Sequence, residues 1–102
     1  MTRQPSLRRD DRVLAATLHV LDAPTLYRRT ERYVDTAKRA IDFEAMLDEP
    51  WSAGERALIE VACSLWGRPD IADGRLSDLL YRIDREGYER VLEAVQLRRG
   101  DT

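Results

Sequence analysis

The apolar residues of this chain recur at helical spacing over most of its length, which favours an all-α fold. Within residues 11–21, leucines stand at i, i+4 and i+7 and predict a first amphipathic helix: Leu14, Leu18 and Leu21. Pro24 then ends this helix and suits the first turn of the next one, because its missing N–H has no partner there in any case.

A long second helix is predicted over residues 25–47, because neither Gly nor Pro interrupts that stretch. Asp35 with Arg39, and Lys38 with Asp42, are opposite charges four residues apart. On a helix, each such pair contributes a few tenths of a kcal/mol. The apolar positions at helical spacing are Leu26, Tyr33, Val34, Ala37, Ile41 and Leu47.

A strongly apolar third helix is predicted over residues 53–66. Ser52 and Glu55 have the spacing of a capping box, in which each side chain accepts the other residue's backbone N–H. Gly67 suits the left-handed position just past the helix end. A helix that is apolar nearly all round is typically buried, so residues 55–66 are the predicted centre of the fold. Its polar positions form one narrow strip: Arg56, Glu60 and Ser64.

A short helix over residues 77–83 and a last one over 85–99 complete the pattern. The last helix has apolar residues at helical spacing, namely Tyr88, Val91, Leu92 and Val95. We therefore expect a compact bundle of about five helices forming one domain, residues 11–100. Residues 1–10 lack a periodic apolar set and are predicted to be a flexible basic arm.

The composition excludes several classes of protein. With 102 residues the chain makes one domain with one modest core. Its longest apolar run, residues 13–21, is far shorter than the 18 or so residues of a membrane helix. Cys63 is the single cysteine, so no intramolecular disulfide forms and a reducing, cytoplasmic location is expected.

The chemistry-bearing residues do not form a catalytic or metal-binding pattern. One His and one Cys make no zinc site, and the five isolated glycines make no phosphate loop, so neither a metal nor a cofactor is expected. Glu60 in the polar strip and His19 in the first helix are the acid–base candidates. We interpret both as structural residues, with Arg56 or a tyrosine hydroxyl the expected partner of Glu60, and predict a non-enzymatic protein.

The two tryptophans are expected to have packing roles. Trp51 precedes Ser52, where an apolar residue often packs against the start of the helix. Trp66 lies at the end of the predicted buried helix. If either side chain were exposed, an interface would become the preferred explanation, because Trp is enriched among residues that dominate binding energy.

Charge, finally, points to a binding surface. Arg makes up 16 of the 17 basic residues although the formal net charge is −2, which fits a GC-rich bacterial or phage genome. The start of the second helix is net basic and its end net acidic. We expect a regulatory, inhibitory or adaptor protein that binds another protein, with a homodimer as one form, through Tyr27, Arg28, Arg29, Arg32 and Arg39.

Nucleic-acid binding is the alternative, and two features support it. The basic residues of the arm and its junction offer phosphate contacts: Arg3, Arg8, Arg9 and Arg12. Residues 55–83 also have the helix–turn–helix order, and the stretch WSAGERALIEVACSLWG resembles the opening of a helix-turn-helix domain of transcription factors. Their connection is about nine residues, where the motif has three or four. An ordinary helix corner is the other interpretation.

Overall fold

The computed structural model describes residues 9–68, 70 and 75–100. Its helices and strands follow in the order α1 (Arg9–Leu21), α2 (Tyr27–Thr30), the 3₁₀ turn η1 (Glu31–Tyr33), β1 (Val34–Asp35), β2 (Ala40–Ile41), α3 (Phe43–Leu47), α4 (Ala53–Trp66), α5 (Leu76–Arg82) and α6 (Arg85–Arg99). The prediction of a mostly helical bundle is confirmed. The predicted arm, residues 1–10, lies outside the described residues up to residue 8, and α1 begins at Arg9.

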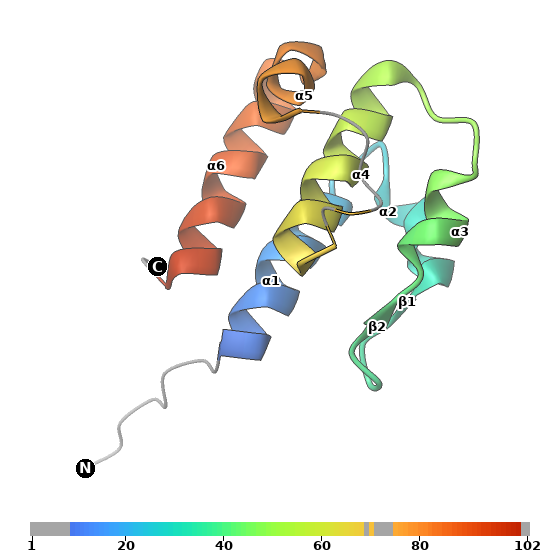
Figure 1. Ribbon diagram of the computed structural model, residues 1–102, viewed down its shortest axis with the longest axis vertical. Coiled ribbons are helices and arrows are strands. Elements are labelled where there is room, and N and C mark those ends of the chain that lie inside the picture. Colours follow the sequence, from blue (N-terminus) through green and yellow to red (C-terminus); the bar gives the residue numbers. More distant parts are fainter. Residues whose placement is uncertain (1–8, 69, 71–74, 101–102) are drawn as a thin grey trace.

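The core lies where α1, α4 and α6 meet (Figure 1). α1 packs along both other helices, while α5 covers one end of α4 and α3 contacts its flank. Seven consecutive residues of α4, from Ala57 to Cys63, are buried. This confirms α4 as the central helix that its nearly continuous apolar sequence predicts.

The ends of α4 are set by the predicted local signals. The Ser52 hydroxyl accepts the backbone N–H of Glu55 at 3.2 Å, and the Glu55 carboxylate accepts that of Ser52 at 3.0 Å. Gly67 follows the helix with φ +98°, a left-handed conformation that residues with a Cβ rarely adopt. These caps place both ends of the central helix where the sequence predicts them.

The predicted long helix over residues 25–47 is wrong. The chain instead turns through α2 and η1 into a two-stranded antiparallel hairpin, in which Val34 pairs with Ile41 and Asp35 with Ala40. β-branched residues favour such extended pairing. The Asp35 carboxylate accepts the backbone N–H of Lys38 at 3.1 Å, so it stabilises a turn rather than a helix.

The charge pairs expected along that helix are also replaced. Arg39 Nη1 lies 2.5 Å from Oδ1 of Asp11 and fastens the hairpin to α1. Asp42 caps α3, since its carboxylate accepts the N–H of Ala45 at 3.1 Å. The partner of Arg39 is therefore 28 residues away in the sequence, whereas helical spacing predicted Asp35, four residues away.

Both tryptophans are half-buried against the core, as expected. Trp51 donates its indole N–H to the carbonyl of Met46 at 2.7 Å, and the guanidinium of Arg29 lies 4.0 Å from the centre of its ring. The indole thus joins the end of α3 to the α2 segment. Trp66 packs at the last turn of α4.

α6 is held against α1 by polar contacts as well as by its buried face. The Arg90 guanidinium donates to the carbonyl of His19 at 2.8 Å, and His19 Nε2 lies 3.2 Å from the carboxylate of Glu93. Asp84 caps α6 by accepting the N–H of Gly87 at 2.8 Å. Within the described ranges, no helix has the length and apolar content needed to cross a membrane.

A methyl group at Gly87 is expected to destabilise the protein. A Cβ there would lie 2.6 Å from Cγ2 of Ile83, closer than packed atoms approach. We expect Gly87→Ala to lower the free energy of unfolding by about 1–3 kcal/mol in urea titrations. The cost should shrink in an Ile83→Leu background, which lacks that methyl. A Gly87→Ala variant as stable as the wild type would contradict this packing.

Candidate protein-binding surface

The outer face of α6 carries three apolar side chains on successive turns, which we call the α6 stripe: Tyr88, Leu92 and Val95. They are 43%, 45% and 41% exposed. Val91 and Ala94 on the inner face are buried, so the apolar positions of α6 span more of the helix than the core covers. Residues four and three apart on a helix lie on one side of it, and the stripe is therefore one continuous surface.

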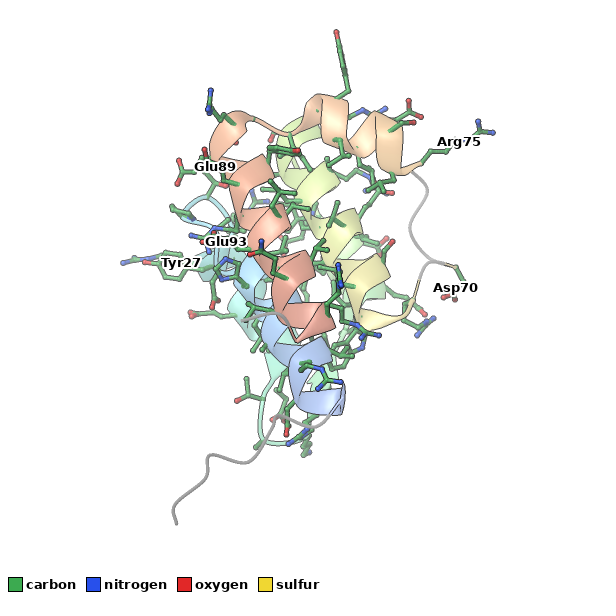
Figure 2. All side chains as sticks on the ribbon, turned by 90° about the vertical axis from the view of Figure 1, so that its left-hand side faces the viewer. Tyr27, Asp70, Arg75, Glu89 and Glu93 are labelled. Atoms are coloured by element: carbon green, nitrogen blue, oxygen red, sulfur yellow. The ribbon has the colours of Figure 1, made fainter. Side chains whose placement is uncertain are left out.

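A shallow groove adjoins the stripe where α5 meets α6. It has a volume of about 500 Å³. Leu80 and Ile83 line it from the α5 side, and Tyr88 and Leu92 from α6. Asp84, Arg85 and Glu89 add the charged part of its lining. In Figure 2, the side chains of Glu89 and Glu93 on α6 lie on the left of the view. The side chain of Tyr27, on α2, lies on the same side. Together the groove and the stripe form an apolar surface with a charged rim.

From the sequence, Tyr88, Leu92 and Val95, together with Val91, are apolar positions at helical spacing, and that spacing does not say which of them are buried. The spacing does identify an apolar face, but it does not tell how the helix is rotated about its axis. The width of the apolar arc is the sequence signal that could have predicted an exposed stripe, because a helix at the edge of a bundle buries only part of such an arc. The predicted set of contact residues therefore did not include the exposed apolar residues of α6.

Two of the predicted partner-binding arginines are held by one internal carboxylate. Arg29 Nη2 lies 3.3 Å from Oε1 of Glu49, and Arg32 Nη2 lies 2.7 Å from Oε2. The hydroxyl of Tyr33 donates to the same Oε2. This cluster around Glu49 ties the α2–η1 segment to the chain leading into α4.

The cluster holds Glu49 in its charged form. The Tyr33 hydroxyl bond is the largest cause that lowers the pKa of Glu49 below its ordinary value of 4.5, and the guanidinium groups of Arg32 and Arg29 act in the same direction. Burial opposes them by favouring the neutral acid. The pKa of Tyr33 is raised in turn, chiefly because its hydroxyl is bonded to that carboxylate.

Of the remaining predicted partner residues, one has an acidic partner within the chain and two face solvent. Arg39 is engaged with Asp11 on α1. Arg28 is exposed, and its Nε donates to the hydroxyl of Tyr27 at 2.9 Å. Tyr27 is itself 41% exposed. The structure therefore brings Arg29 and Arg32 together, holds Arg39 apart from them on the hairpin, and leaves the pair of Tyr27 and Arg28 facing solvent.

Two of the four predicted nucleic-acid contacts lie beyond the part that the structure describes. Arg3 and Arg8 are outside the described residues, and Arg9 begins α1. Arg12 is half-buried, and its side chain runs beside Gly100 at the end of α6. In the segment 55–83, α4 is buried and nine residues separate it from α5.

Both acid–base candidates have partners within the chain. Glu60 is 2% exposed, and its carboxylate lies 3.7 Å from Nε of Arg56, as predicted. His19, on α1, contacts Glu93 on the neighbouring helix α6. Cys63 donates its thiol to the carbonyl of Arg68 at 3.0 Å, and burial raises its pKa to about 11, which disfavours the reactive thiolate.

A second hollow, of about 460 Å³, lies between the starts of α4 and α6. Its charged lining mixes both signs, with Glu55, Asp84 and Glu86 against Arg82 and Arg90. Across the described ranges, no three His, Cys, Asp or Glu side chains are grouped so as to hold a metal ion. No protein-family model, curated protein or solved structure matches the chain. Function is therefore inferred from the chemistry of the surface.

The Glu49 cluster predicts a dependence of stability on pH. A carboxylate whose pKa is lowered by folding stabilises the protein above its unfolded pKa, and this contribution is lost as the pH falls through the folded value. We expect the stability difference between wild type and Glu49→Gln to be largest near neutral pH and to shrink below pH 4.5. Urea unfolding at several pH values measures it.

The Tyr33→Phe background is the control, because it removes the largest cause of the shift. There, the pH-dependent part of the Glu49→Gln effect should be smaller. A stability difference that stays constant from neutral to acid pH would contradict the role assigned to Glu49.

Proposed function

We propose that this protein acts without catalysis, by binding another protein through the α6 stripe and the adjoining groove. A regulatory, inhibitory or adaptor role fits that mode of action. The observation that carries the proposal is the exposure of three neighbouring apolar side chains on one helix face: Tyr88, Leu92 and Val95. Single exposed apolar residues are ordinary on a protein surface, but a contiguous patch with a polar rim is typical of interaction sites.

The size of the patch indicates the strength of the contact. Full burial of an apolar side chain contributes about 1.5–3 kcal/mol, so three half-exposed ones contribute roughly 2–4 kcal/mol. Association costs at least as much in lost freedom of motion. The groove and the charged rim must therefore add to the stripe, and we expect a reversible complex rather than a permanent one.

Side-chain chemistry also favours the stripe over the predicted arginine surface as the centre of the contact. Arg29, Arg32 and Arg39 already have acidic partners within the chain, so a binding partner would have to compete with them. Tyr27 and Arg28 are exposed and suit a polar rim. Aromatic residues and Arg are the types enriched in protein interfaces.

Replacing Leu92 should weaken partner binding. We expect Leu92→Arg to weaken capture of the partner from extract of the native host at least about tenfold, because it places a charge at the centre of an apolar contact. Leu76→Arg is the matched control, since Leu76 is a 62% exposed leucine on α5 outside the stripe and the groove lining. It should leave capture unchanged.

The same assay separates the competing interpretations. An apolar centre predicts a mild loss of binding with salt, whereas phosphate contacts predict a steep one. Capture that survives Leu92→Arg but is lost with Arg28→Glu would contradict the stripe and support the arginine surface. Capture abolished by nuclease treatment would support nucleic-acid binding instead.

A further inference from the structure

A third, smaller hollow lies where the end of α1, the α2–η1 segment and β1 meet. Its volume is about 290 Å³, and it shares no lining residue with the groove beside α6 or with the hollow at the starts of α4 and α6. Leu18 and Leu21 of α1 and Val34 of β1 line it with apolar surface. The ring of Tyr27, 41% exposed, adds a further apolar side.

The segments around this hollow are fastened to one another. The hydroxyl of Thr30, which is 2% exposed and belongs to the lining, lies 3.1 Å from the carbonyl oxygen of Leu26 and 3.4 Å from that of Leu21. It therefore joins α2 to the end of α1. Val34 is held by its pairing with Ile41 in the hairpin. The shape of the hollow is thus fixed by the fold.

Asp22 and Glu31 give the hollow a negative rim. Both are exposed, and neither carboxylate makes an ion pair or accepts a hydrogen bond within the described part of the chain. Among the described residues that line the hollow, none is basic. Arg28 stands outside the lining, and its Nε donates to the hydroxyl of Tyr27. Basic side chains of the adjoining segments are engaged elsewhere: Arg32 with Glu49, Arg39 with Asp11 and His19 with Glu93.

The end of α1 adds to this negative charge. The helix runs for 13 residues to Leu21, and Asp22 follows it directly. The C-terminal end of a helix dipole is negative, so a carboxylate there is unfavourable and a cation is favourable. Asp42 and Asp84, by contrast, stand at helix starts and cap them. Departures from such local rules without a compensating contact are expected at functional sites.

We propose that this hollow is a docking site for a lysine or arginine side chain of a protein partner. Such side chains lay an apolar stem along an apolar surface and keep the charged head at its edge, which is how the lining and rim of the hollow are arranged. Sites for small molecules occupy about 300–1,000 Å³, so a hollow of about 290 Å³ suits a single side chain better than a whole cofactor. The inference goes beyond the proposed function, because the α6 stripe contributes no residue to this site.

Amide NMR titrations of the full chain test the site with one side chain at a time. The probes are Nα-acetyl-lysine methylamide and Nα-acetyl-arginine methylamide, and both are expected to shift the signals of Leu18, Tyr27 and Val34. Nα-acetyl-norleucine methylamide has a similar apolar stem without the charge. It should bind about tenfold more weakly, because it forms no ion pair with the rim.

Neutral variants of the rim provide the second arm. Asp22→Asn and Glu31→Gln should each raise the dissociation constant of the lysine probe about threefold, and the double variant about tenfold. Asp78→Asn is the matched control, since Asp78 is an exposed carboxylate on α5 outside the hollow, and it should leave the constant unchanged. A norleucine probe that binds as tightly as the lysine probe, or rim variants that bind like the control, overturns the inference.

Unfolding of Asp22→Asn in urea separates binding from a structural role. Since this carboxylate has no partner within the described chain and stands at the negative end of α1, its neutralisation should leave the unfolding midpoint unchanged or raise it. A lowered midpoint would make Asp22 a structural residue and overturn its role in docking.

A free amine is the competing occupant, and putrescine is the probe for it. Tighter binding of this diamine than of either amino-acid derivative would identify a small amine as the ligand and overturn the side chain of a partner. Leu92→Arg should leave all of these titrations unchanged. The docking site and the proposed function of the α6 stripe therefore fail or stand independently of each other.

Discussion

The burial of α4 is the constraint on which the rest of this fold depends. Seven consecutive buried residues, 57–63, leave that helix with no face for solvent, so the remainder of the chain has to cover it on every side. Glu60 is the charged residue within this run, and Arg56 one turn earlier is its partner. α1 and α6 cover one side, α5 an end, and α3 a flank. The segment before α3 is also held against α4. The Arg29 guanidinium lies on the ring of Trp51, and Trp51 stands just before the start of α4 and donates to the carbonyl of Met46.

This arrangement explains both surfaces considered as binding sites. α6 packs mainly along α1 and buries one face, which leaves the outer part of its apolar arc exposed. The arginines of the α2–η1 segment and the hairpin are used differently. Glu49 and Asp11 engage Arg29, Arg32 and Arg39, so much of the basic surface serves to hold irregular segments to the helices. Part of the abundant charge of this chain therefore stabilises its packing through ion pairs within the chain. The apolar stripe is a surface that this packing does not cover.

The sequence predicts the helices whose ends are set locally and misses what depends on distant residues. The capping box at Ser52 and the glycine at position 67 are readable within a few residues, and α4 begins and ends where they indicate. The helix expected over residues 25–47 is replaced by a hairpin in which Arg39 pairs with Asp11, a partner that only the tertiary fold brings near. The exposure of the α6 stripe was not predicted, for a related reason. Spacing defines an apolar face, but the rotation of α6 against α1 decides which of its residues are buried.

The central claim is that the outer face of α6 is covered by protein when the molecule is at work. Amide NMR shifts followed while the chain is concentrated, and again as a binding partner is added, test this residue by residue. The account predicts that the signals that move belong to Tyr88, Leu92, Val95 and the groove beside them, with α4 unaffected. Shifts confined to Tyr27 and Arg28, or an α6 that does not respond under either condition, would contradict it.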